Sequence, residues 1–239
     1  MPNITVHHLN HSRSDRILWL LEELGLDYTV KVHYRTKAGF APQSLRDVSD
    51  IAKSPVLEID GAVLTESGAI VHALLARYWT PGRGLERTPS ETSVFWGYFS
   101  EGTLMLHLQP ARTAQLGARI FAADETLSAA ERAGTQKFYA WFQDTARGTV
   151  EPALAKVESY LAQQGPGVGF SGTAELGEGD FMMAFALNNI AYGGKVRLYA
   201  LGPASLAWVD RMRARPAFVR AQERIRADED GQRGSASRL

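Results

Sequence analysis

The sequence predicts an α/β domain followed by an all-helical domain. Strand and helix signals alternate through residues 1–80, after which Pro81-Gly82-Arg83-Gly84 interrupts the pattern. Beyond this break the strand signals end and apolar residues recur at helical spacing. A chain of 239 residues is long enough to form either one large core or two smaller ones.

Composition excludes several classes of function. The 26 basic residues balance the 26 acidic ones, so we expect no nucleic-acid partner. No apolar run approaches the ~20 residues of a membrane span, and the first residues lack a secretory signal pattern, so we expect a cytoplasmic protein. The chain has no cysteine, which excludes disulfides and a cysteine nucleophile. Any thiol that reacts here must therefore arrive with a ligand.

The α/β domain begins with a strand, a helix and a second strand. Residues 4–9 are β-prone, and residues 14–24 place apolar side chains at helical spacing. Gly25 is expected to end this helix, and residues 28–34 alternate like a strand. Because βαβ crossovers are right-handed, the two strands should be parallel neighbours.

A hairpin and a helix complete this domain. Residues 56–59 and 62–65 flank Asp60-Gly61, which favours a type I′ turn, and a helix is expected from Ser67 to Tyr78. Pro55 stands directly before the hairpin, as a cis-proline turn would. The fold class is thus βαβ-ββα with a mixed four-stranded sheet.

The remaining chain is expected to form a helical bundle. We predict domain boundaries at 1–80, 81–89 for the linker, 90–227 for the helical domain and 228–239 for a flexible tail. Asp180 follows Gly177 at the spacing of a helix-capping motif, which indicates a structural role. The periodicity predicts helices over residues 91–116, 128–147, 150–164, 180–192, 203–213 and 216–227.

Three motifs carry a resemblance to a known family. They are the run from Ser12 to Leu26 (SRSDRILWLLEELGL), the run from Lys53 to Leu57 (KSPVL) and the run from Glu66 to Ile70 (ESGAI). In this order and spacing they resemble the cytosolic glutathione S-transferases, and the similarity covers residues 4–225. The resemblance implies a thioredoxin-like α/β domain that binds glutathione, an all-α second domain and a homodimer.

The resemblance also implies how glutathione is held. Ser54, before a cis Pro55, would pair its main chain with the cysteinyl part of the tripeptide. Ser67, at a helix start, would hold the γ-glutamyl carboxylate, and Glu66 would accept from the ammonium group. Lys53 either meets a carboxylate of glutathione or stays a solvated surface lysine.

Catalysis in this family requires stabilisation of a thiolate, and an ordinary thiol has a pKa near ~8.5. The family uses a Tyr, Ser or Cys after the first strand. No tyrosine lies in residues 6–15 and the chain has no cysteine, so serine remains. Ser12 is the expected catalytic residue. Ser14 is better explained as a helix N-cap. Two other interpretations are that the catalytic position of the family falls on His11, one residue earlier, or that the site is built from the backbone alone.

The second substrate should be a small hydrophobic electrophile. In the family its pocket lies beside the first long helix of the second domain, where Tyr98 and His107 combine apolar bodies with polar groups. His7 and His8 point to opposite faces of a strand, so we expect no metal site.

Two functions are consistent with these residues. The first is a glutathione transferase. The second is a non-catalytic protein that binds glutathione or hydrophobic ligands, which the unusual loop Asp50-Ile51-Ala52 would suit.

Overall fold

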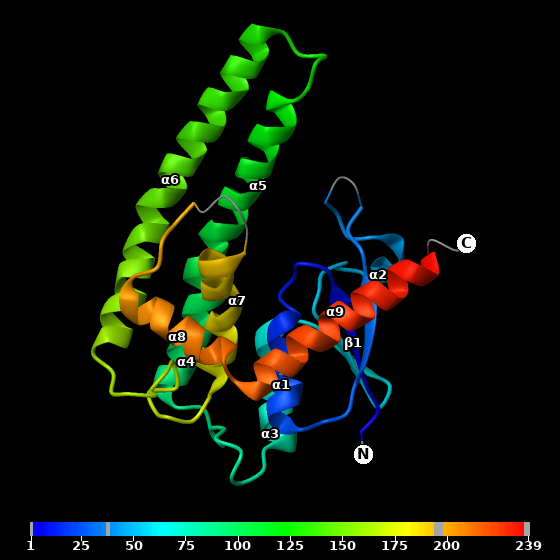
Figure 1. Ribbon diagram of the computed structural model, residues 1–239, viewed down its shortest axis with the longest axis vertical. Helices are drawn as coiled ribbons and strands as arrows, with labels where there is room; N and C mark the ends of the chain where they lie inside the picture. The colour runs from blue at the N-terminus through cyan, green and yellow to red at the C-terminus, as the bar shows by residue number, and fades with distance from the viewer. Residues whose placement is uncertain (1, 37–38, 194–197, 237–239) are drawn as a thin grey trace.

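A computed structural model describes residues 2–36, 39–193 and 198–236. An α/β part containing the N-terminus lies beside a helical part, from which two long helices project as an arm (Figure 1). The expected combination of a thioredoxin-like domain with a helical part is confirmed.

The sheet contains strands β1 (Ile4–Leu9), β2 (Thr29–His33), β3 (Val56–Ile59) and β4 (Ala62–Leu64), in the order β2-β1-β3-β4. The β1 and β2 strands are parallel, as the crossover rule requires, and the other two pairs are antiparallel. The predicted mixed four-stranded sheet is therefore confirmed.

Two turns in this part follow from local backbone chemistry. Helix α1 (Asp15–Leu24) ends at Gly25, whose φ of 62° is left-handed. This backbone conformation costs little free energy at glycine, because glycine has no Cβ. Asp60 and Gly61 have φ values of 50° and 86°, the two positive values that a type I′ turn needs. Short helix α2 (Gln43–Arg46) and helix α3 (Ser67–Tyr78) complete the α/β part.

The helical part is continuous from α4 into α5 through a π-helical segment, η1. Its elements are α4 (Glu91–Phe99), η1 (Ser100–Met105), α5 (Leu106–Ala122), α6 (Ala129–Ala162), α7 (Glu178–Tyr192), α8 (Pro203–Arg213) and α9 (Pro216–Ala236).

Two sequence predictions are wrong here. The separate helices expected over residues 128–147 and 150–164 are one helix, α6, which passes through Pro152. Burial of one stripe, from Ala146 to Leu161, outweighs the local break at Gly148 and Pro152. The flexible tail expected from residue 228 is helical as far as Ala236, because α9 packs on the α/β part.

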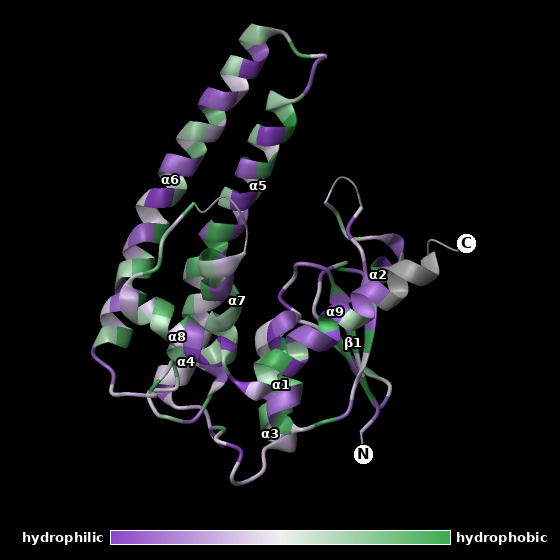
Figure 2. Cartoon of the chain, in the orientation of Figure 1, coloured by the Kyte–Doolittle hydropathy of each residue, from purple (hydrophilic) through white to green (hydrophobic). Residues whose placement is uncertain are grey.

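Aromatic and aliphatic side chains form one core across both parts. The ring of Trp19 on α1 lies 4.5 Å from that of Phe181 on α7, and it also meets Phe218 on α9. Figure 2 shows hydrophobic residues concentrated along α1, α3 and α7, whereas the arm of α5 and α6 alternates in character. Within the described chain, no helix combines the length and apolarity that crossing a membrane demands.

Candidate active site

The topology brings the three sequence motifs to one end of the sheet. The β1 strand ends at Leu9, and β3 begins beside it because His7 pairs with Val56. The β4 strand ends next to the start of β3, since Leu57 pairs with Leu64. The β1–α1 loop, the Ser54-Pro55 turn and the start of α3 therefore share one edge.

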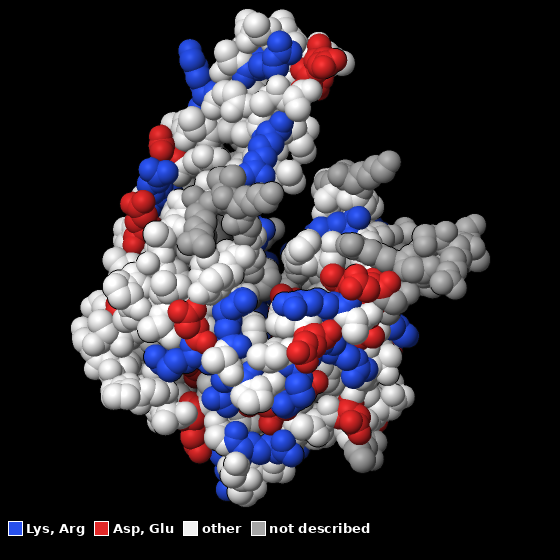
Figure 3. All heavy atoms as spheres, in the orientation of Figure 1, with Lys and Arg blue, Asp and Glu red and all other residues white. Residues whose placement is uncertain are grey.

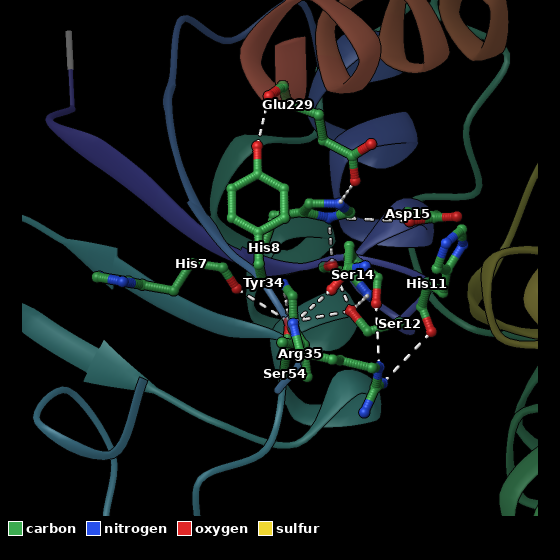
Figure 4. Close-up of polar contacts among 12 residues, drawn as sticks. His7, His8, His11, Ser12, Ser14, Asp15, Tyr34, Arg35, Ser54 and Glu229 are labelled. Carbon is green, nitrogen blue, oxygen red and sulfur yellow. Dashed lines mark hydrogen bonds and ion pairs between the residues drawn. The ribbon is translucent and has the colours of Figure 1, made fainter. Parts of the chain in front are cut away.

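Three serines form a cluster at this edge, which we call the serine cluster: Ser12 and Ser14 are buried, and Ser54 is half-buried. The Oγ of Ser12 lies 2.7 Å from the Oγ of Ser14 and 3.1 Å from the Oγ of Ser54 (Figure 4). Ser12 keeps 6% of its surface exposed and Ser14 none. A molecule that approaches this edge would meet Ser12 before Ser14.

Ser14 does not do what the sequence suggested. It stands at the N-cap position of α1, but its hydroxyl makes no cap bond. That hydroxyl lies instead 2.7 Å from Nδ1 of His8, which is also buried. The prediction that this side chain caps the helix is therefore wrong, because its hydroxyl pairs with His8 on β1 instead.

His8 connects the serine cluster to the last helix. Its Nε2 lies 3.3 Å from Oε1 of Glu229 on α9, and Figure 4 shows the ring between Glu229 and Ser14. Burial lowers the pKa of His8, although the hydrogen bond and charge of Glu229 oppose this effect. Asp15 lies 3.9 Å from Nδ1 of His8, and its pKa is raised to about 7 by burial and by the charge of Glu229.

The Ser54-Pro55 peptide bond is cis, as expected. The Ser54 hydroxyl donates to the carbonyl oxygen of His7 at 3.0 Å and accepts from the Leu9 N–H at 3.2 Å. These bonds tie the turn to the end of β1, so the Ser54 side chain is a structural link. Lys53, one residue earlier, is exposed at the edge of the site.

The start of α3 has an unusual backbone. Glu66 has φ 64° and ψ 116°, values that a residue with a Cβ rarely adopts. Such a conformation costs about 1–3 kcal/mol and tends to persist at ligand sites. The Glu66 side chain is exposed, whereas Ser67 is buried as the first residue of α3. The N–H groups of the first turn of α3 thus face the shared edge.

The helical part reaches the site through Glu101 in η1. One carboxylate oxygen of Glu101 lies 2.8 Å from Nη1 of Arg13, and the other lies 2.8 Å from Nη2 of the buried Arg16. Arg16 also donates to the carbonyl oxygen of Met182 on α7 at 3.0 Å. Arg13 is thus paired across the two parts of the molecule, so its charge is partly neutralised beside Ser12.

Arg35 is a part of the site that the sequence analysis did not predict. It donates to the carbonyl oxygens of Asn10, Gly39 and His11 and so holds the loop that carries Ser12. Burial and the nearby charge of Arg112 on α5 both lower the pKa of Arg35. Figure 3 shows the surface notched between the projecting arm and the α/β part.

Tyr98 and His107 lie on the helical part. Tyr98 on α4 is 80% exposed, and His107 on α5 is half-buried. Among the hydrogen bonds of the described residues, neither side chain joins the serine cluster.

His7 and His8 make contacts on opposite sides of β1, as their alternation predicted. The Nδ1 of His7 lies 3.0 Å from Nε2 of His33, and its Nε2 lies 3.1 Å from Glu58. In the part of the chain that the structure describes, no His, Asp and Glu side chains gather in an arrangement suited to a metal ion.

Sequence reasoning missed His8, Arg35 and Glu229 as parts of this site. His8 could have been found, because it precedes Ser14 by six residues across one strand-to-helix turn. Glu229 had no local signal, since 221 residues separate it from His8.

The sheet order, the cis-proline turn and the attached helical part define a thioredoxin-like protein with an all-helical second part. A family model described as the glutathione S-transferase N-terminal domain matches residues 1–74. Glutathione S-transferase 3 of Schizosaccharomyces pombe is 39% identical over 104 residues, which are 43% of this chain and 43% of that protein. The matched region is thus less than half of this curated relative's length.

Solved structures extend the likeness to both parts. A glutathione S-transferase from Actinobacillus pleuropneumoniae is 28% identical, with a TM-score of 0.62 over 92% of this chain and 91% of its own. The theta class enzyme of Xanthomonas axonopodis pv. citri, solved with glutathione bound, shares the fold at 24% identity, with a TM-score of 0.63 over 92% and 97%. Residues 1–74 are thus similar to the N-terminal domain of glutathione S-transferases, and both parts of the chain share the fold of solved glutathione S-transferases.

Proposed function

We propose that this protein is a glutathione transferase in which the Ser12 hydroxyl stabilises the thiolate of glutathione. The observation that carries the proposal is the position of Ser12, buried at the start of α1 and beside the cis Ser54-Pro55 turn. A hydroxyl donor and the positive end of a helix both favour a thiolate, which is the nucleophilic form of the thiol.

Glutathione is an anionic tripeptide, and the shared edge suits it. The main chain of Ser54 would pair with the cysteinyl part, and Ser67 with the first turn of α3 would hold the γ-glutamyl carboxylate. Glu66 would accept from the ammonium group, and exposed Lys53 would meet a carboxylate. Arg35 and Arg112 add positive charge beside the site.

The thiolate would then attack a small hydrophobic electrophile from the side of the helical part. His107, half-buried on α5, is the better candidate for contact with it, because Tyr98 is 80% exposed. We also propose a homodimer that acts in the cytoplasm, as the family resemblance implies.

A second function, binding without catalysis, is favoured by one observation. The Ser12 hydroxyl already has Ser14 and Ser54 as partners, so in this alternative it would serve the structure of the loop. The loop of Asp50-Ile51-Ala52 would then belong to a carrier of glutathione or hydrophobic ligands.

Steady-state turnover of glutathione with a reactive aryl halide separates the two functions. We expect turnover by the wild-type protein, and a decrease in kcat/KM of about 100-fold in Ser12→Ala, because one thiolate donor is lost. Binding to immobilised glutathione should be nearly unchanged in this variant.

Ser159→Ala is a matched control, since Ser159 is exposed on α6. It should keep wild-type kinetics. Tight binding of glutathione without turnover of any electrophile would support the carrier instead, and unchanged turnover in Ser12→Ala would remove Ser12 from the mechanism.

A further inference from the structure

Four side chains form one continuous line from the site to the last helix. Ser12 lies 2.7 Å from Ser14, Ser14 lies 2.7 Å from Nδ1 of His8, and Nε2 of His8 lies 3.3 Å from Glu229. We call this line the relay. The two inner members, Ser14 and His8, are buried, whereas Glu229 at the far end is 21% exposed. Only the Ser12 end faces the edge where glutathione would bind.

The protons of the relay have one consistent order when His8 is neutral. Glu229 can only accept while it is ionised, so Nε2 of His8 carries the ring proton and Nδ1 accepts from the Ser14 hydroxyl. Two lone pairs cannot face each other at 2.7 Å, so the Ser12 hydroxyl, which donates to Ser54 at 3.1 Å in the structure, must then turn to the oxygen of Ser14. In this state the Ser12 proton points inward, and its oxygen can accept a proton from outside.

The order reverses when His8 is protonated. Nδ1 of His8 then donates to Ser14, Ser14 donates to Ser12, and the Ser12 hydroxyl points outward as a donor. Each contact along the relay again holds one proton, and in both states the Ser12 hydroxyl has turned away from Ser54, whose own hydroxyl still donates to the His7 carbonyl oxygen. The relay thus has two satisfied states, one that accepts from a thiol and one that donates to a thiolate.

We propose that the thiol proton of bound glutathione stays inside the protein and moves through Ser12 and Ser14 to His8. The S–H bond breaks as Ser12 takes the proton, Ser12 passes its own proton to Ser14, and Ser14 passes its own to Nδ1 of His8. The products are a thiolate that accepts from Ser12 and an imidazolium that donates to Glu229. This inference rests on the proposed function and adds the destination of the proton.

The charges around His8 suit both states. Glu229 and Asp228 on α9 favour the imidazolium, whereas His11 and His33 oppose it. Asp15 on α1, 3.9 Å from His8, adds to the first group only in its ionised form. Burial lowers the pKa of His8 and keeps the ring neutral at rest, ready to accept a proton. Arrival of a thiolate at the other end of the relay adds an attractive negative charge. Glu229 is a positioning residue here, because it acts through His8.

The relay predicts an unusual proton balance on binding. Titration of the wild-type protein with glutathione near neutral pH should produce the ultraviolet absorbance of a thiolate without release of a proton to the buffer. An indicator dye measures the release in the same cuvette. Release of one proton for each thiolate formed would overturn the relay, because the proton would have gone to solvent.

Variants of the relay give the second readout, the pH at which the bound thiol ionises. His8→Asn can still accept a hydrogen bond from Ser14 but cannot store a proton, and Ser14→Ala breaks the line. Both should raise the apparent pKa of the bound thiol by about 1–3 units and then release one proton per thiolate. Ser14→Thr retains a hydroxyl and should restore the wild-type values.

Glu229→Gln keeps its shape but loses the charge that stabilises the imidazolium, so it should raise the same pKa by a smaller amount. Glu223→Gln is the matched control, because Glu223 is an exposed glutamate on the same helix. It should leave the thiol titration unchanged. Melting curves of each variant show whether the fold is intact.

The outcomes separate this inference from the proposed function. The pKa of the bound thiol in His8→Asn and in Ser14→Ala could equal that of the wild-type protein while Ser12→Ala still has a lower kcat/KM. That result would overturn the relay and leave the proposed transferase function intact. Absence of glutathione binding by the wild-type protein would overturn both.

Discussion

His7 and His8 are adjacent in β1, yet they serve different networks because a strand turns successive side chains to opposite faces. His8 faces the serine cluster and α9. His7 and His33 stack with ring centroids 5.3 Å apart and link Glu58 on β3 to Ser44 on α2. In the neutral state each ring donates one proton along this line and accepts one, so the line is satisfied without any charge on a histidine.

The pair of His7 and His33 makes the stability of the fold depend on pH. Burial lowers the pKa of His33 to about 4, and it also lowers that of His7. The unfolded chain therefore binds more protons than the folded chain between about pH 6.5 and 4, so stability should fall as the pH decreases through this window. We expect the free energy of unfolding to decrease by about 1–2 kcal/mol after solvent screening. For a chain of this length, each kcal/mol corresponds to a decrease in Tm of about 2–4 °C.

Thermal melts between pH 7.5 and pH 4.5 measure this loss. His33→Asn should be less stable at neutral pH but should show a weaker pH dependence, because one titrating group is gone. An equally steep dependence in that variant would assign the effect to other groups.

At this scale the sequence placed Ser12 and Ser54 in one expected site, and the structure brings these two side chains together, but the sequence did not predict all their partners. The tyrosine-free stretch of residues 6–15 pointed to Ser12, and the structure places that buried side chain in the serine cluster. The role of Ser14 depended on a contact with His8 that only the strand-to-helix geometry sets. Glu229 depended on the path of α9, which starts at residue 216 and whose packing no local pattern encodes.

Helices α7 and α8 have glycine at the N-cap position, Gly177 and Gly202, so neither N-cap has a side chain. Side chains of neighbouring helices accept hydrogen bonds from N–H groups at the start of both helices instead. The Ser93 hydroxyl on α4 accepts from the Gly179 N–H at 3.0 Å, at the start of α7. Glu158 on α6 accepts from the N–H groups of Ala204 and Ser205, both at 2.8 Å, at the start of α8. Each cap therefore also fixes one helix against another.

This arrangement predicts that restoring a local cap at α7 is harmful. A Cβ on Gly177 would lie 2.1 Å from Oε2 of Glu86 and 2.4 Å from the Oγ of Ser93. Gly177→Ser should therefore lower stability, although serine is ordinarily the better N-cap by a few tenths of a kcal/mol. Ser93→Ala should cost about 0.5–2 kcal/mol, as the loss of a cap does.

Urea unfolding followed by circular dichroism measures both changes. Ser128→Gly removes the N-cap of α6, whose capping bonds stay within the first turn of that helix, so it serves as the comparison for a cap within one helix. A stability gain in Gly177→Ser would show that the site relaxes around the new side chain.

Element boundaries were predictable where they depended on local chemistry and not where they depended on packing. The end of α1 at Gly25 and the turn at Asp60-Gly61 follow from left-handed backbone values. The continuity of α6 and the π-helical segment η1 follow from burial against other helices, which overrides the propensity of Gly148 and Pro152. Asp180 accepts from the Gly177 N–H at 3.0 Å, as its spacing predicted.

For the molecule as a whole, α9 and η1 join the two parts. Three arginines of α9 or the turn before it reach the α/β part: Arg215 pairs with Glu23, Arg220 pairs with Glu22, and Arg224 donates to the carbonyl oxygen of Tyr28. Tyr34, which directly follows β2, donates to the backbone carbonyl of Glu229. The relay therefore forms only when both parts are assembled.

Arg16 is the most deeply buried of these links, and its charge depends on one partner. Its side chain is 0% exposed, and its guanidinium is paired with Glu101, while Nε has no hydrogen-bond partner within the described residues. Loss of the Glu101 carboxylate would leave a buried cation without compensation, which typically costs about 3–5 kcal/mol. Glu101→Gln should therefore lower the free energy of unfolding by an amount near the low end of this range.

The matched control is Glu151→Gln, which removes one carboxylate from the exposed pair of Arg147 and Glu151 on α6. That change should cost under about 1 kcal/mol, because exposed ion pairs contribute little. Urea unfolding in low and high salt measures both. If Glu101→Gln costs no more than the control, or if Arg16→Met does not rescue it in the double variant, the buried pair does not hold the two parts together.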